Sequence, residues 1–158
     1  MKQHTTKPSA NLLSNILQCK CPKCREGKLF TQPNPYKLKE VLSMHHECPV
    51  CKQPTEIEVG FYTGAAYVAY ALTVALAVSI FVAWYVLIGF TFSLDDNRIF
   101  GCLATTIVGI VVMTPVFMRL SRIIWLSFFV HFDPNWRTNG IGDYERINPI
   151  GMESARQF

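Results

Sequence analysis

The chain has 158 residues and a net charge of +4, and half of its residues are hydrophobic while only 16% are charged. This composition excludes an ordinary soluble domain. Two stretches, 61–94 and 99–118, contain no charged residue. Each is long enough to cross a hydrocarbon core about 30 Å thick, which takes roughly 20 apolar residues. The sequence therefore predicts a mainly α-helical membrane protein, with a small module ahead of a two-helix transmembrane hairpin and a short tail behind it.

The predicted segments are, in chain order, an N-terminal tail with a short amphipathic turn (1–18), a zinc-ribbon-like module (19–60), a first transmembrane helix (61–92), a periplasmic loop (93–98), a second transmembrane helix with an interfacial extension (99–132) and a tail (133–158). The turn at 12–17 is too short and too polar for the apolar core of a signal peptide. We expect it to lie on the bilayer or to pack on the module. Pro115 is expected to bend the second helix.

The distribution of lysine and arginine predicts the orientation. Nine of these residues precede the first apolar stretch, five follow the second, and only Arg98 lies between them, next to two aspartates. Positive charge is retained on the cytoplasmic side of membrane proteins. Both termini are therefore expected in the cytoplasm, with the short loop outside.

Four of the six cysteines form two C-x2-C pairs separated by 23 residues: Cys21, Cys24, Cys48 and Cys51. Two residues between cysteines allow one tight turn to direct both thiolates at a single ion, and four thiolates complete a tetrahedral Zn²⁺ site. Such a site has no open position for a substrate, so it is structural. Thiolates persist in a reducing cytoplasm, which is where the charge distribution places this segment.

Several alternatives remain open at the cysteines. A redox-active cysteine pair, or iron or copper in place of zinc, fits the same residues, and Cys19, His45 or His46 could replace one ligand. Zinc ribbons commonly carry glycine after the second cysteine of each pair, where this chain has Arg25 and Lys52. Short ribbon strands are expected at 28–31 and 56–59, the latter from its alternating pattern.

Small residues mark the start of the first apolar helix. Gly60 and Gly64 stand four residues apart and Ala65 follows, a spacing that allows a second helix to approach closely. The second helix of the same chain is preferred over a partner protein as the occupant of this groove. Three nearby tyrosines are further candidates for contact with a partner or a helix: Tyr62, Tyr67 and Tyr70.

Two arginines mark the end of the second apolar stretch. Arg119 and Arg122 lie on one helical face, and Trp125 follows them. Amphipathic and basic side chains favour the membrane interface. We expect these three residues to anchor the helix in the headgroups or to meet an acidic edge of a partner.

The cysteine pairs in their context resemble a known family. Residues 21–30 and 48–67, with the Gly-Phe-Tyr-x-Gly-Ala motif at 60–65, resemble the bacterial family named domain of unknown function 983. Glu-Val-Gly at 58–60 departs from the Glu-Pro-Gly of that family. The resemblance implies a multi-pass protein of the bacterial inner membrane without an established activity. Some relatives are encoded near haem–copper oxidase genes, which implies a link to respiratory complexes.

These observations favour a non-catalytic accessory subunit or assembly factor of an inner-membrane complex, and the resemblance points to a respiratory haem–copper oxidase or supercomplex. No Ser/His/Asp set, paired carboxylates or phosphate loop can be assembled, so an enzyme is not expected. The alternative is a membrane-anchored thiol or metal sensor or a metallochaperone that uses Cys19 beside Cys21. The expected partners are a membrane protein complex and the lipid bilayer, with neither nucleic acid nor a small-molecule substrate.

Overall fold

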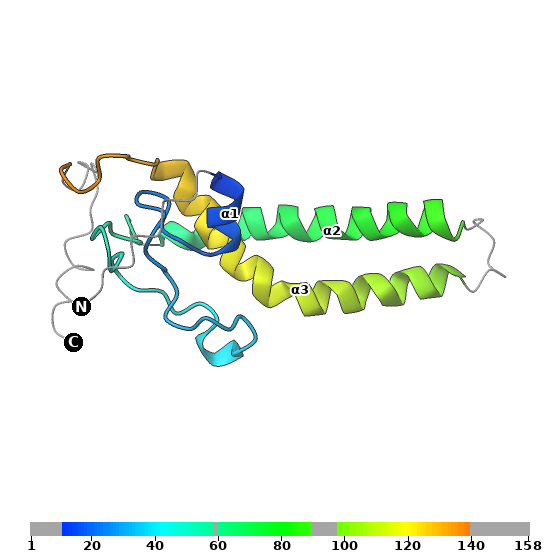
Figure 1. Ribbon diagram of the computed structural model, residues 1–158. Helices are drawn as coiled ribbons and strands as arrows, with labels where there is room; N and C mark the ends of the chain where they lie inside the picture. The colour runs from blue at the N-terminus through cyan, green and yellow to red at the C-terminus, as the bar shows by residue number, and fades with distance from the viewer. Residues whose placement is uncertain (1–10, 59, 90–97, 140–158) are drawn as a thin grey trace.

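A computed structural model describes residues 11–58, 60–89 and 98–139. Its helical elements are α1 (Leu12–Leu17), the 3₁₀ turns η1 (Leu38–Glu40) and η2 (Phe61–Thr63), α2 (Ala65–Leu87) and α3 (Arg98–Phe129). Figure 1 shows α2 and α3 side by side as a long hairpin, with α1 and the cysteine-bearing loops gathered at one end. Residues 1–10, 59, 90–97 and 140–158 lie outside the described residues, and with them the predicted tail ends, the end of the first predicted helix and most of the predicted loop.

Two helical spans, Phe61–Leu87 and Arg98–Phe129, are long and apolar enough to cross a membrane. The first ends before the predicted boundary at residue 92, and Gly89 takes a left-handed φ of 65° just after it. On α2 only Ala65 is buried, and many of its apolar side chains are exposed. Soluble monomers rarely expose so large an apolar surface. The hairpin therefore requires lipid or protein around it.

Glycines allow α2 and α3 to pack closely. Three glycines each lie against a large side chain of the opposite helix: Gly64 against Trp125, Gly101 against Trp84, and Gly109 against Ile80. A Cβ at Gly64 would overlap the Trp125 ring. The groove at Gly64 is thus filled by α3 of the same chain. Gly60 has a different role. It is the residue before the η2 turn, and its φ of 74° lies in the left-handed region that favours glycine.

Replacement of Gly64 by leucine is expected to force α2 and α3 apart. Extra methylene groups in a packed seam destabilise by about 1–3 kcal/mol, and the Trp125 ring leaves no space for them. A lower unfolding midpoint of the purified chain in detergent, with zinc content unchanged, would show this. Ala66→Leu is the matched control, because Ala66 is exposed on α2. Equal midpoints for the two variants would contradict the proposed packing at Gly64.

The module between α1 and η2 contains isolated β-bridges and no strand among its described residues, so the prediction of ribbon strands is wrong. The bridges join Lys20 with Lys28, Phe30 with Met44, and Glu47 with Pro54. The segment at 28–31 does pair, through hydrogen bonds from Thr31 N to Ser43 O and from His45 N to Leu29 O. After the second cysteine pair, however, residues 53–55 make the pairing, while the described residues 56–58 of the predicted strand form no bridge. Proline at 54 has no N–H to extend this ladder.

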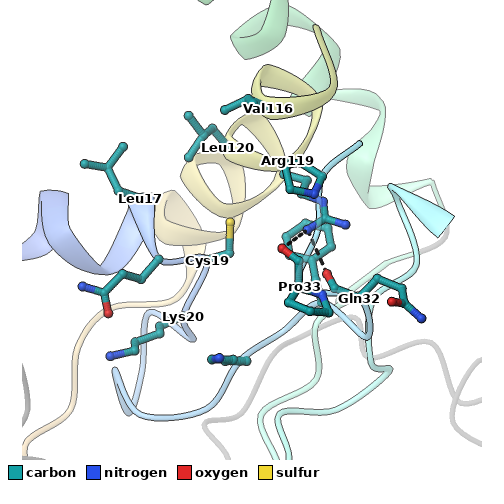
Figure 2. A pocket seen from close by; sticks show the side chains of 12 residues that line it. Leu17, Cys19, Lys20, Gln32, Pro33, Val116, Arg119 and Leu120 are labelled. Atoms are coloured by element: carbon teal, nitrogen blue, oxygen red, sulfur yellow. Dashed lines mark hydrogen bonds between the residues drawn. The ribbon is translucent and has the colours of Figure 1, made fainter. Parts of the chain in front are cut away.

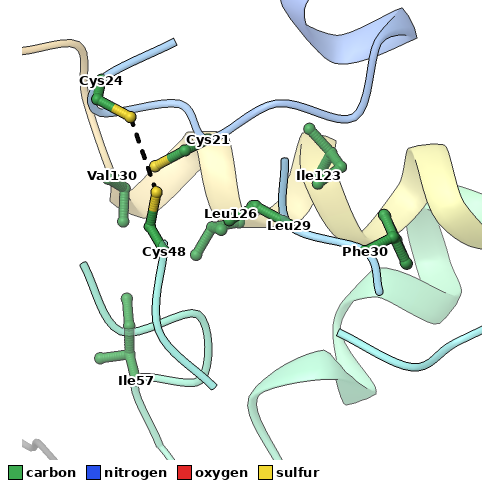
Figure 3. Packing of buried hydrophobic residues seen from close by; sticks show 9 residues of the cluster. All are labelled: Cys21, Cys24, Leu29, Phe30, Cys48, Ile57, Ile123, Leu126 and Val130. Atoms are coloured by element: carbon green, nitrogen blue, oxygen red, sulfur yellow. Dashed lines mark hydrogen bonds between the residues drawn. The ribbon is translucent and has the colours of Figure 1, made fainter. Parts of the chain in front are cut away.

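The last two turns of α3, together with Val130 just after them, form the core of the module. Ile123, Leu126 and Val130 are at most 2% exposed and pack with Cys21, Cys24 and Cys48, as Figure 3 shows. The remaining members of this buried cluster are Leu29, Phe30 and Ile57. This part of α3, predicted as an interfacial extension, is therefore buried on one face against the cysteine loops. Spacings of three and four residues place its apolar side chains on one face.

A bend in α3 accompanies this packing. Figure 1 shows that α3 changes direction before it reaches the module, and Pro115 lies inside the helix. Proline lacks an N–H and clashes with the preceding turn, which bends helices. The bend directs the end of α3 over the cysteine loops.

The chain after α3 returns over the first cysteine pair. The backbone N–H of Asp133 donates to Lys23 O at 3.2 Å. Arg137 lies 3.7 Å from the Glu26 carboxylate. The module is therefore held by α3 on one side and by residues 133–137 on another.

Candidate metal centre

Four cysteines from the two loops converge in the module. The Sγ atoms of Cys21, Cys24, Cys48 and Cys51 all lie within 4.8 Å of one another, and all four thiols are free of disulfides. Cys24 and Cys48 are fully buried, Cys21 is 1% exposed, and Cys51 is half-buried. The structure thus brings together the four residues that the spacing predicts, in a site that can hold one metal ion.

The two cysteine pairs adopt the same turn. Arg25 N donates to Cys21 O at 2.8 Å, and Lys52 N donates to Cys48 O at 2.9 Å. Both Arg25 and Lys52 have a φ of 58°, in the left-handed region that favours glycine. This is the physical reason that zinc ribbons commonly carry glycine there. The present chain keeps the turn with larger residues.

Two of the sulfur–sulfur distances match those around a tetrahedral zinc ion. Zinc binds thiolate sulfur at about 2.3 Å, so the edge of a regular ZnS₄ tetrahedron is about 3.8 Å. The Sγ atoms of Cys21 and Cys51 are 3.7 Å apart, and those of Cys24 and Cys48 are 3.8 Å apart. The donor set and its dimensions are therefore compatible with zinc.

Hydrogen bonding among the thiols raises the pKa of some of them and lowers the pKa of others. The hydrogen bond with Cys24 raises the pKa of Cys21, while the same contact lowers the pKa of Cys24. Hydrogen bonding with Cys21 also lowers the pKa of Cys48 to about 7. Four thiolates this close repel one another strongly. Full ionisation of the cluster therefore requires a cation at its centre.

The alternative ligands do not join the cluster. Neither Cys19, His45 nor His46 belongs to the group of converging ligand atoms. Burial raises the pKa of Cys19, and the nearby Arg119 charge offsets this only in part. A thiol with a raised pKa is a poor nucleophile and a poor ligand.

Gly27 supports the metal centre and was not predicted as a site residue. Its N–H points at Cys24 Sγ, 3.5 Å away, and a Cβ at this position would overlap Cys48 Sγ. Its backbone O also accepts from Cys21 N at 2.8 Å. The signal in the sequence was a glycine three residues after the second cysteine of the first pair.

Replacement of Gly27 by alanine is expected to displace the Cys48 thiol and to weaken metal affinity by about 10–100-fold, the usual range for residues that support ligands. Competition with a chromophoric chelator on the purified chain would measure this. Lys52→Gly is the control, because it alters the second turn at a φ that glycine adopts without strain. Unchanged affinity for Gly27→Ala would contradict the close approach of Gly27 to the thiol.

Arg119, predicted as an anchor at the membrane interface, faces the module. It is 4% exposed, and its Nε donates to Val41 O at 3.1 Å. Its Nη atoms donate to the carbonyl oxygens of Gln32, Pro33 and Asn34. A single side chain of α3 thereby fixes the loop that connects the two cysteine pairs.

Arg122 and Tyr62 form a second, more exposed contact between α3 and the module. Arg122 donates to Leu42 O at 3.0 Å and lies over the Tyr62 ring. The Tyr62 hydroxyl donates to Thr55 O at 2.7 Å. Tyr62 thus contacts its own chain.

Trp125 is held within the hairpin. Its Nε1 donates to Phe61 O at 2.8 Å, and its ring packs against those of Phe61 and Phe129. These contacts join η2 to α3 beside the module.

Tyr67 and Tyr70 point outward. They are 77% and 72% exposed, one helical turn apart at the module end of α2. Further exposed apolar residues follow at helical spacing: Val74, Val78 and Phe81. We call these five residues the α2 stripe. A hydroxyl-bearing apolar stripe of this kind suits a membrane interface or a partner helix.

Comparison with protein-family models, with curated proteins and with solved structures gave no match. The resemblance to domain of unknown function 983 stays a prediction.

Proposed function

We propose that this chain is a non-catalytic accessory subunit or assembly factor of a larger complex in a bacterial inner membrane. The observation that carries the proposal is the shared core of the cysteine loops and α3. Through this core the metal centre packs directly against the hairpin. Such a unit suits docking, because its buried thiols offer no open site for substrate and its α2 stripe faces outward.

The bound ion in this proposal is Zn²⁺. Four sulfur ligands at tetrahedral spacing favour it, and zinc brings no redox chemistry of its own. The ion would hold the two loops together, and Gly27 and the Arg25 and Lys52 turns would orient the thiolates. Its contribution is structural, since a module of this size lacks a large apolar core.

The hairpin in this proposal crosses the membrane with both termini in the cytoplasm. The charge distribution supports this orientation. α3 has 32 residues and is about 48 Å long, which exceeds the hydrocarbon thickness by about 18 Å. This excess matches the part of α3 from Arg119 onward that packs on the module, so the module sits directly at the membrane surface.

The partner in this proposal is an integral membrane complex, for which a respiratory haem–copper oxidase or supercomplex is the first candidate, from the family resemblance. The α2 stripe provides the docking face. Aromatic side chains dominate binding energy at interfaces, and Tyr67 and Tyr70 are its most exposed members.

The test is purification of the tagged full chain from native membranes in mild detergent. We expect stoichiometric recovery of the subunits of one membrane complex, and loss of that complex with Tyr67→Ala/Tyr70→Ala. The control is Val86→Ala/Leu87→Ala, which removes exposed apolar side chains at the far end of α2. Recovery of a lone, functional monomer would contradict the proposal.

The second candidate was a thiol or metal sensor. It requires an exchangeable thiol next to the ion. Cys19 lies outside the cluster and three ligands are buried, which favours the structural site over ligand exchange.

A further inference from the structure

A cavity of about 380 Å³ lies where α1, the loop after the first cysteine pair, and α3 meet (Figure 2). Its lining includes Cys19 but none of the four converging cysteines. The cavity is therefore separate from the metal centre.

Three cations line this cavity. Lys20 and Lys28 stand directly opposite each other at an antiparallel bridge, and Arg119 is 4% exposed. Arg119 donates only to neutral backbone carbonyls. Within the described ranges, none of the three has a carboxylate partner. Like charges side by side repel, and a buried charge without a counter-charge is unfavourable. The cavity therefore favours an anion.

The other wall of the cavity is apolar. Figure 2 shows Val116 and Leu120 of α3 on one side and Lys20 on the opposite side. Leu17 of α1 joins this wall and is 70% exposed, and the exposed Leu12 and Leu13 continue the apolar surface along α1. Exposed leucines beside a membrane-spanning segment suit the apolar side of a membrane interface. The cavity thus runs from a cationic end to an apolar end.

We infer that this cavity binds an anionic phospholipid, with its phosphate between Lys20, Lys28 and Arg119 and an acyl chain along Val116 and Leu120. Basic pockets beside transmembrane helices on the cytoplasmic side hold acidic headgroups. A free phosphate would meet only the cationic end and would leave the apolar wall uncovered. The inference rests on the proposed membrane placement of the hairpin, but it requires no partner complex.

The test uses the purified full chain in mild detergent, titrated with phosphatidylglycerol, with phosphatidylcholine of the same acyl chains, and with inorganic phosphate. Native mass spectrometry measures lipid retention, and zinc content is checked in parallel. Lys20→Gln/Lys28→Gln is expected to weaken phosphatidylglycerol binding by about tenfold or more, because two charge-assisted contacts are lost. The control is Lys37→Gln/Lys39→Gln, which removes the same charge at exposed positions outside the cavity.

Selective binding of phosphatidylglycerol that the control variant retains would support the inference. Equal binding of phosphatidylcholine, equal loss in the control variant, or a response to inorganic phosphate as strong as that to the lipid would each overturn it. A failure here leaves the co-purification of a partner complex untouched, and a lone monomer that still binds the lipid would overturn only the accessory role.

Discussion

Replacement of Cys24 by serine is expected to abolish metal binding and to unfold the module. Binding of a structural zinc contributes about 10–16 kcal/mol at pH 7, and in a small module that energy is folding energy. Cys24 is fully buried among the other thiols. In the serine variant no other ligand can therefore reach the metal in place of the lost thiolate. Metal analysis of the purified chain should fall from one ion to none, and limited proteolysis should cut within residues 20–55.

Two other cysteines provide the control for this experiment. Cys19 and Cys102 lie outside the cluster, so Cys19→Ser and Cys102→Ser should retain one ion and a protease-resistant module. Loss of metal from Cys19→Ser would revive the exchangeable-thiol alternative. Retention of a full metal complement by Cys24→Ser would show that the cluster is not the metal centre.

Replacement of Arg119 by glutamine is expected to release the loop between the cysteine pairs from α3. Four backbone carbonyls lose a charged donor, and a hydrogen bond to a charged group contributes about 1.5–3 kcal/mol. Hydrogen exchange at residues 32–42 should accelerate strongly, and the unfolding midpoint of the chain in detergent should fall.

Arg122→Gln is the matched control. Arg122 lies one turn further along α3 but makes one exposed hydrogen bond and a contact with the Tyr62 ring. Its loss is expected to cost about 1 kcal/mol. Similar effects of the two variants would mean that both arginines act at the membrane surface, as the sequence suggested.

The sequence predicts local features of this protein better than contacts between distant segments, such as those of Arg119. The cysteine cluster was predictable, because a C-x2-C turn is local and its spacing alone aims two thiolates at one point. The long helices were predictable from the uninterrupted apolar stretches. The role of Arg119 depends on carbonyl groups 78 to 87 residues away in sequence, and no periodic pattern encodes a contact with an irregular loop.

The end of α3 and the ribbon strands are two places where the local sequence pattern was not sufficient. The spacing of Ile123, Leu126 and Val130 already described one apolar face, but the sequence did not say whether lipid or protein covers it. The alternation at 56–59 favoured a strand, yet the turn after Cys51 pairs residues 53–55 first. In both cases the local pattern allowed more than one structure, and tertiary contacts determined which one formed.

The central claim is a closed four-sulfur zinc centre within the module that packs on α3. X-ray absorption spectroscopy of the full chain purified under reducing conditions tests it most directly. We expect one zinc per chain with four sulfur neighbours at about 2.3 Å and no nitrogen or oxygen neighbour. A shell that contains nitrogen or oxygen, or a metal-free protein with a Cys21–Cys24 disulfide, would contradict the claim.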